Sequence, residues 1–388
     1  MKSMKHSRKI PVMILIFTNT LFLSGCWNYH EVDTLRVVAG VAIDKSETGD
    51  QYLLTVETVD IRYGKDAETT SNTITVAGDT LFDAKKNMAS ISGKKLYFAH
   101  ARIAVLSQDV AAEGAVKAID WLARNSELRE DIEVLVSQES TAKEILETGS
   151  KTDQIISFEL DKVLKEQKNI ANAPEKELWG LISDLGGSGI SAVLPVVSLQ
   201  EVNGRALPSV MGTAVFKKDK LVGFLNDDKT KDMLLIQNKV DEGSLVQNGG
   251  GEDTGPKVSL KIFDNTTKLK PAVNNGNVEI SINIKTTAAI EEIEGTENYI
   301  DEPGRLLLEQ RAEENMKKSI ENVIKEVQTK FDSDIFGFGA KVKADMPGTW
   351  KEIGTMWDDK FKDVKVSVHP EITIKNSAAF SQPLRIGE

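Results

Sequence analysis

The chain has 388 residues, of which 28% are charged and 40% hydrophobic, and its formal net charge is −11 at pH 7. This length predicts two or three domains with real hydrophobic cores, and the composition excludes a wholly disordered, collagen-like or multi-span membrane chain. The acidic balance argues against nucleic acid as a partner, because a duplex-binding surface is cationic. One cysteine excludes an internal disulfide and a Cys-based zinc site, and four scattered histidines do not suggest a metal centre.

The first segment has the pattern of a signal peptide. Residues 1–10 carry four Lys or Arg and no acid, and an apolar run follows over 10–23. That run is too short for a membrane-spanning helix, which needs about 20 apolar residues. It ends in Leu-Ser-Gly-Cys at residues 23–26, which resembles the bacterial lipobox. We therefore expect removal of residues 1–25 and lipidation of Cys26; the alternatives are a plain signal peptide with a stray cysteine, or an uncleaved anchor.

Lipidation at Cys26 has consequences for attachment and charge. A diacylglyceryl group supplies the two acyl chains that stable membrane anchoring needs. Cleavage removes four cations and no acid, so the mature chain carries 44 cationic and 59 acidic side chains, a net charge of −15. Because an acidic body is repelled by an anionic membrane, we expect the lipid to be the tether.

The mature chain begins with alternating strand and helix patterns. Apolar and β-branched runs predict strands at 35–43, 52–59, 73–76, 102–106, 131–136 and 190–199. Apolar residues at helical spacing predict helices from a cap at Asp79 to about residue 90, and at 110–123, 141–147, 153–168 and 175–184. A turn signal over 200–208 predicts a boundary, giving an N-terminal region 26–205, with room for two subdomains, and a C-terminal domain 206–388.

The sequence of the C-terminal domain predicts a hairpin, a helix and two alternating strands. The hairpin is expected at 209–217 and 220–225, a short helix at 229–237, and a loop at 247–256. Residues 277–288 alternate apolar and polar, as expected for a strand with one buried face. The final strand, 364–375, has the same period, and Pro370 predicts that it lies at an edge or is bent there.

The longest predicted helix spans residues 305–331. One apolar stripe runs along it, formed by Ala312, Met316, Ile320, Val323, Ile324, Val327 and Phe331. Four Glu residues each precede a Lys by four positions, an orientation that supports a helix. The stripe suits packing on the chain's own sheet, with a partner helix as the alternative. Together these patterns predict an α+β fold of two to three domains, each a mixed or antiparallel β-sheet covered by helices.

The sequence contains no recognisable catalytic motif. It has neither a Gly-x-Ser-x-Gly elbow nor a His-Glu-x-x-His pair, and the glycine-rich loop at 247–256 is not followed by Gly-Lys-Ser/Thr. The paired carboxylates Asp227-Asp228 and Asp358-Asp359 have the character of helix-start or surface charges. We therefore predict no enzymatic activity, no cofactor and no metal site.

Two segments together resemble one lipoprotein family. The mature start, Cys-Trp-Asn-Tyr-His-Glu-Val-Asp-Thr-Leu at 26–35, resembles the opening of the Ger(x)C family, the C subunits of nutrient germinant receptors in endospore-forming bacteria. Asp-Ile-Phe-Gly-Phe-Gly at 334–339 and the later Pro347, Trp350, Trp357 and Phe361 resemble its C-terminal part. The order of these motifs matches the family from the lipobox to near the chain end.

The resemblance implies a function that composition does not. It implies a lipoprotein on the outer face of the spore inner membrane that assembles with integral-membrane A and B subunits to trigger germination when nutrients appear. It implies domains built on β-sheets with helices, and no catalytic residue. Alternatives of other classes are a substrate-binding lipoprotein of a transporter and a surface-anchored envelope hydrolase.

An aromatic group in the C-terminal motif has two possible roles. Phe336, Phe338, Trp350 and Trp357 could form a docking patch for a partner, with glycines between them permitting a tight turn. They could equally fill the gap between the helix 305–331 and the last sheet, since large aromatics dominate cores as well as interfaces.

Overall fold

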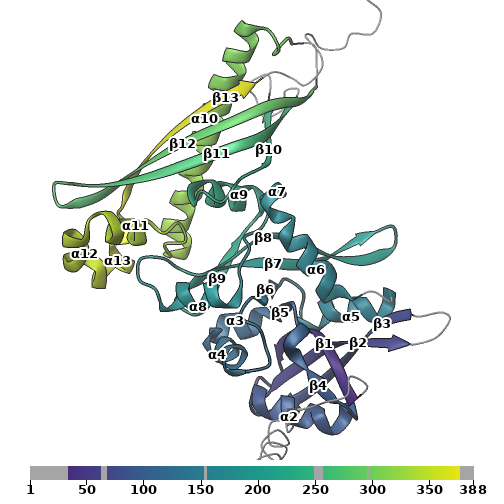
Figure 1. Ribbon diagram of the computed structural model, residues 1–388. Coiled ribbons are helices and arrows are strands. Elements are labelled where there is room, and N and C mark those ends of the chain that lie inside the picture. Colours follow the sequence, from purple (N-terminus) through teal and green to yellow (C-terminus); the bar gives the residue numbers. More distant parts are fainter. Residues whose placement is uncertain (1–33, 63–67, 153–154, 249–256, 295–296, 376–388) are drawn as a thin grey trace, which may run out of the picture.

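The computed structural model describes residues 34–62, 68–152, 155–248, 257–294 and 297–375. Its strands form two sheets, one of nine strands and one of four. Figure 1 shows the first sheet at one end of the molecule and the second at the opposite end. The expected α+β class, with sheets covered by helices, is confirmed.

The first sheet is mixed. It contains β1 (Leu35–Lys45), β2 (Tyr52–Arg62), β3 (Glu68–Gly78), β4 (Lys95–Tyr97), β5 (Ile103–Leu106), β6 (Glu133–Ser137), β7 (Val193–Val202), β8 (Arg205–Lys217) and β9 (Lys220–Leu225). Their order is β3-β2-β1-β5-β6-β7-β8-β9, with β4 beside β1. The central strands β1, β5, β6 and β7 are parallel, and antiparallel hairpins extend the sheet on both sides. The central strands are apolar where they are buried, as over 38–43 in β1 and along all of β5, because helices cover both faces.

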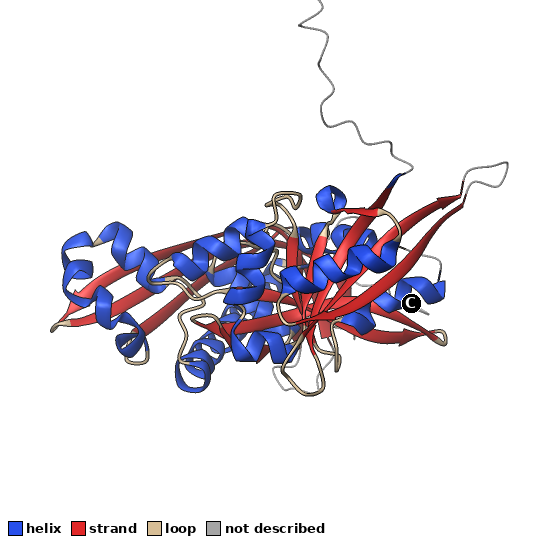
Figure 2. Cartoon of the chain, turned by 90° about the horizontal axis from the view of Figure 1, so that it is seen from below, coloured by secondary structure: helices blue, strands red, loops and turns tan. Residues whose placement is uncertain are grey.

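Helices cover the two faces of this sheet. On one face lie α2 (Leu81–Ser92), α3 (Gln108–Gly114), α4 (Val116–Arg124) and α8 (Leu178–Gly186). On the other lie α5 (Lys143–Thr152) and α6 (Ile156–Lys165), followed by the short α7 (Gln167–Ile170). Short 3-10 turns occur at η2 (Phe98–His100) and η4 (Gly354–Met356). Figure 2 shows the strands of both sheets with helices packed against them.

The second sheet has the order β10-β11-β12-β13. Its strands are β10 (Gly243–Asn248), β11 (Lys257–Asn274), β12 (Asn277–Ile293) and β13 (Lys365–Lys375), and only the β12–β13 pair is parallel. One face is covered by α9 (Asp227–Ile236), α10 (Glu302–Glu326), α11 (Phe338–Asp345) and α13 (Trp357–Phe361), with α12 (Pro347–Ile353) beside them. The described residues contain no helix that is long and apolar enough to cross a membrane.

The apolar stripe of the long helix packs inside the protein, as expected. All seven stripe residues are buried in the core shared with the second sheet. Asp301 caps α10 by accepting a hydrogen bond from the Gly304 N–H, and the last turn, η3 (Val327–Phe331), widens to a π-helix. Of the four expected Glu–Lys pairs, Glu326–Lys330 forms, at 3.6 Å.

The two alternating strands are confirmed. Val278, Ile280, Ile282 and Ile284 of β12 are buried, and Val368, Ile372 and Ile374 of β13 point into the same core. As Pro370 predicted, β13 is an edge strand, because it pairs with β12 alone.

Three local expectations differ from the structure. The helix expected at 110–123 is two helices, α3 and α4, because Gly114 adopts φ +143° and the Ala115 N–H donates to the Asp219 carbonyl. The side-chain cap of α2 is Thr80 rather than Asp79. The 18-residue strand β11 was not expected, because Pro271 and bulges at 259–264 interrupt its alternation.

The expected boundary at 205/206 falls at the start of β8, just after the turn of the β7–β8 hairpin. Strands β8 and β9 continue the first sheet beyond it to Leu225, so the sheet itself does not end there. Pairing to β7 supplies the hydrogen bonds that these strands need. Of the loop expected at 247–256, residues 247–248 belong to β10 and the rest lie outside the described residues.

Candidate functional site

A buried carboxylate organises the motif at residues 334–339. Asp334 follows the turn that ends α10 and is only 4% exposed. Its two oxygens accept hydrogen bonds from the backbone N–H groups of Gly337, Phe338 and Gly339 at 2.8–3.1 Å. The indole Nε1–H of Trp357 donates to it at 2.9 Å. Burial raises the pKa of Asp334 to about 6, and the four donors oppose this shift.

Gly189 and Gly339 allow the motif to pack closely against the segment that leads into β7 of the first sheet. A Cβ on Gly339 would lie 2.6 Å from the Gly189 Cα, and Gly189 itself has φ +84°. The Ala340 N–H donates to the Gly189 carbonyl at 2.7 Å, and the Ser191 N–H donates to the Asp334 carbonyl at 2.8 Å. The motif is therefore joined by backbone hydrogen bonds to the segment that leads into β7, and so connects the two sheets.

Polar side chains strengthen the same junction. Asp332 accepts from Lys217 at the end of β8 and from Lys362, the latter at 2.9 Å. These two cations lower the pKa of Asp332 against the opposing effect of burial. The Ser333 hydroxyl donates to the carbonyl of Phe216, also in β8. Contacts from β8 and from the loop before β7 thus hold the residues 332–340 in place.

Three of the four aromatic candidates are core residues. Phe336, Phe338 and Trp357 are at most 3% exposed, and the first two rings stack at 5.2 Å. Trp350 is half-buried and its ring lies 5.7 Å from that of Trp357. In this structure, therefore, Phe336, Phe338 and Trp357 fill the space between α10 and the junction, and no exposed docking patch is formed by them.

A cleft opens beside the junction. It has a volume of about 570 Å³ and is lined by residues of both halves, among them Ser188, Lys218, Asp219, Asp332 and Trp357. Its charged groups are mostly carboxylates, and Asp184 at its rim is paired with Lys176 at 2.6 Å. The cleft is a concave surface that neither half forms alone.

The remaining sequence candidates do not converge on a catalytic site. Cys26 lies outside the described residues. His100 lines an open hollow with Glu159 and Asp161, but these acids pair with Lys162 and Lys165, and no described hydrogen bond joins them to the histidine. His369 is in the edge strand β13. Among the described residues, no group of three His, Cys, Asp or Glu could hold a metal ion.

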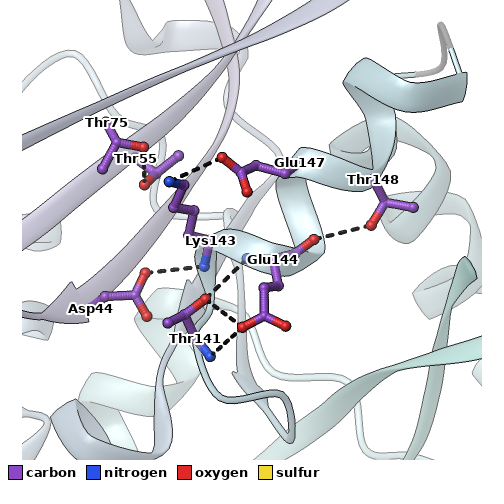
Figure 3. A network of polar contacts seen from close by, with 8 residues as sticks. All are labelled: Asp44, Thr55, Thr75, Thr141, Lys143, Glu144, Glu147 and Thr148. Atoms are coloured by element: carbon purple, nitrogen blue, oxygen red, sulfur yellow. Dashed lines mark hydrogen bonds and ion pairs between the residues drawn. The ribbon is translucent and has the colours of Figure 1, made fainter.

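Two buried acids that sequence reasoning missed cap helices on the first sheet. Asp44 of β1 accepts from the Ala142 and Lys143 N–H groups at the start of α5, and Figure 3 shows the bond from Lys143. Burial raises its pKa to about 6, and these donors oppose the shift. Glu57 of β2 accepts from the Ile156 and Ser157 N–H groups at the start of α6, both at 2.8 Å.

A capping box reinforces the start of α5. The Thr141 hydroxyl accepts from the Glu144 N–H, and the Glu144 carboxylate accepts from the Thr141 N–H, as Figure 3 shows. The Thr-x-x-Glu spacing was a sequence signal for this helix start. Asp44 could not have been found this way, because it lies almost one hundred residues upstream. Asp44 and Glu57 stabilise the starts of α5 and α6, so we assign both acids a structural role.

The chain matches two family models along most of its length. The N-terminal match, described as "Spore germination protein N-terminal domain", covers residues 28–199. The C-terminal match, "Spore germination B3/ GerAC like, C-terminal", covers residues 211–378. The gap between them lies at the β7–β8 hairpin.

Proteins of similar sequence are also named as spore germination proteins. Spore germination protein KC of Bacillus subtilis (strain 168) is 21% identical over 403 residues, covering 97% of this chain and 98% of that protein. Spore germination protein B3 of the same organism is 23% identical over 371 residues, covering 93% and 95%. The crystal structure of the GerBC protein matches with a TM-score of 0.58 at 19% identity, covering 87% of this chain and 97% of that one, and supports the fold.

Fold and matches together define a two-domain spore germination protein in which a glycine-rich junction joins a mixed nine-stranded sheet to a four-stranded one. The chain belongs to the Ger(x)C family, the C subunits of germinant receptors.

Proposed function

We propose that this chain is a membrane-tethered lipoprotein subunit of a nutrient germinant receptor, acting by assembly and not by catalysis. The observation that carries the proposal is a lipobox ending at Cys26 directly before the two family domains, at 28–199 and 211–378. The acylated chain would sit on the outer face of the spore inner membrane. Its partners would be the integral-membrane A and B subunits, and its response would be to nutrients.

A pull-down from spore inner membranes tests this proposal. The full chain would carry a C-terminal affinity tag, be solubilised in mild detergent, and be captured with its neighbours for mass spectrometry. We expect A-type and B-type integral-membrane subunits in the eluate, and none from an untagged strain. Recovery of a transporter permease in their place would contradict the proposal.

A genetic experiment addresses the nutrient response separately. Deletion of the gene should abolish germination with at least one nutrient, because a receptor lacking a subunit would not trigger. Spores that germinate normally with every nutrient, in a strain without paralogues, would contradict the receptor role.

The cleft between the two halves favours one alternative, a substrate-binding lipoprotein of a transporter. Such proteins bind a small ligand between two lobes, and a cleft of about 570 Å³ is large enough for an amino acid or a sugar. The hydrogen bonds around Asp334 beside the cleft argue against a free hinge. Calorimetry with the purified chain separates the two: tight binding of one amino acid or sugar would favour the alternative.

A further inference from the structure

The helix α2 presents an outward face on which an aromatic ring and a lysine are exposed and Asp83 is partly exposed. Phe82, Lys86, Ala89 and Ser90 recur along one side of the helix and are all exposed, and Phe82 is 70% exposed. The opposite side, with Leu81, Ala84 and Met88, is buried on the sheet. Large exposed apolar side chains beside a lysine, here Phe82 with Ile91 at 66% exposure, are typical of a surface that meets a partner or a membrane.

The segment that contains α2, residues 79–97, has a positive net charge, whereas the chain as a whole is negative. Residues 79–97 hold four lysines and two aspartates, a net charge of +2, whereas the mature chain has a net charge of −15. Lys86 and Lys94 form no ion pair with any described residue, while Lys85 and Lys95 share Glu127 at 3.8 and 3.5 Å. An anionic surface would therefore attract this part of the chain and repel most of the rest.

The tether begins at the same end of the molecule. Leu35, the first residue of β1, pairs with Lys95 of β4, three residues beyond the end of α2. Eight peptide steps separate Cys26 from Thr34, so their Cα atoms can lie at most about 29 Å apart. A lipid on Cys26 would keep α2 within reach of the bilayer, with the four-stranded sheet at the other end of the molecule (Figure 1).

An adjacent groove also combines aromatic and cationic side chains. It lies between α2 and α4, has a volume of about 570 Å³, and is lined by Phe82 and Trp121 together with Lys85 and Lys117. Arg124 and Asp120 also line it and pair with each other at 2.8 Å. Aromatic rings beside cationic side chains are the combination found where proteins meet lipid headgroups.

We propose that the outward face of α2, with Phe82 as its apolar anchor and Lys86 as a cation, lies together with Lys94 just after the helix against the anionic lipid surface to which the chain is tethered. This inference rests on the proposed lipidation of Cys26. It orients the molecule, because the four-stranded sheet then projects away from the membrane.

Fluorescence of the acylated full chain on vesicles tests the contact. Because the only native cysteine is consumed by the lipid, Ala89→Cys introduces a single free thiol for a polarity-sensitive dye. Ala272→Cys, exposed on the second sheet, is the matched control. We expect blue-shifted emission and quenching by lipid-borne quenchers at position 89 in vesicles of phosphatidylcholine with phosphatidylglycerol, a weaker shift in phosphatidylcholine alone, and none at position 272.

Two further results separate the contact from the tether. Adding Phe82→Ser and Lys86→Glu should abolish the shift at position 89 while the chain still floats with the vesicles. A chain that floats but keeps a water-like emission at position 89 would overturn the α2 contact alone. A chain that does not float would overturn the lipid tether, and the contact with it.

Discussion

The carboxylate of Glu313 on α10 accepts a hydrogen bond from the backbone N–H of Ile372 on β13, at 2.9 Å. One helical turn earlier, Glu309 accepts from the Ile374 N–H at 2.7 Å. These N–H groups point away from β12, at the free edge of the sheet, and Pro370 lacks an N–H there. The helix and the proline thus block an edge that could otherwise pair with another chain.

Replacing both glutamates should expose that edge. We expect Glu309→Ala together with Glu313→Ala to lower the free energy of unfolding by about 2 kcal/mol, since each removes a charge-assisted hydrogen bond. Self-association should also rise, which analytical ultracentrifugation would detect. Glu321→Ala, on an exposed position of the same helix, is the control. An unchanged stability in the double variant would contradict the role of these bonds.

The Gly339 position should tolerate no side chain. A Cβ there would lie 2.4 Å from the Trp357 Nε1 and 2.6 Å from the Gly189 Cα, and the second contact is with backbone that cannot move aside cheaply. We expect Gly339→Ala to cost about 3 kcal/mol or more, by the overpacking seen in dense cores. Urea unfolding gives the measurement. Gly348→Ala in α12 meets no atom within 4 Å and should be neutral or stabilising.

Replacing the indole of Trp357 should lower the free energy of unfolding more than replacing that of Trp350. Trp357→Phe removes a donor to the buried Asp334 and leaves a gap, so we expect a loss of about 3 kcal/mol. The same change at the half-buried Trp350 removes no hydrogen bond that the structure describes and should cost about 1 kcal/mol. Equal losses in the two variants, measured by chemical unfolding, would show that the bond to Asp334 contributes little.

Asp232 should make stability depend on pH. Burial raises the pKa of its carboxyl from 3.8 to about 6, while the Ser319 hydroxyl donates to it. The folded state therefore binds the proton more tightly than the unfolded state. The resulting stabilisation is complete below about pH 4 and is lost as the pH rises through about 6, a change of about 3 kcal/mol.

The variant Asp232→Asn removes this titration and keeps an oxygen for Ser319. Relative to the native chain, it should become more stable as the pH rises from 4 to 7, by up to about 3 kcal/mol. Urea unfolding at a series of pH values gives the difference, with Asp363→Asn on the surface as the control. A difference that does not change with pH would refute the assignment.

Loss of Cys26, the proposed site of acylation, should release the chain from membranes. Cys26→Ala removes the thiol that would carry the lipid, and the folded domains begin some residues later, so the variant should fold and appear in the soluble fraction. Fractionation with immunodetection gives the result, and circular dichroism verifies folding. A variant that still sediments with membranes after removal of the signal segment would show that another feature is the main tether.

Elements with a strong period could be predicted from the sequence. The stripe of the long helix and the alternation of β12 and β13 survive because one face of each is buried, which imposes a period of 3.6 or 2 residues. Strand β11 was missed because Pro271 and two bulges break its period. The division of residues 110–123 into two helices depends on the Asp219 carbonyl, about one hundred residues away.

The candidate site, like the fold, has some features that the sequence predicts and others that depend on distant contacts. Cys26 could be proposed as a lipidation site because charge, apolar run and small residues are contiguous in the chain, and its lipidation stays a prediction. The motif at 334–339 was visible, but the role of its acid was not, since the partners of Asp334 include Trp357 and the segment at 189–191. Whether the aromatic residues face a partner or a core is a matter of packing, which spacing alone does not determine.

By itself, the sequence determined the class of the protein, the alternating elements and the family resemblance, because each is encoded by neighbouring residues; lipidation at Cys26 stays a prediction from the same kind of local pattern. Only the tertiary structure decided that β8 and β9 extend the first sheet, that Asp334 and the glycines 189 and 339 join the two halves, and that α2 and the start of β1 share one end. Those features arise from contacts between residues far apart in the chain, where burial and unpaired hydrogen-bond donors select the partner.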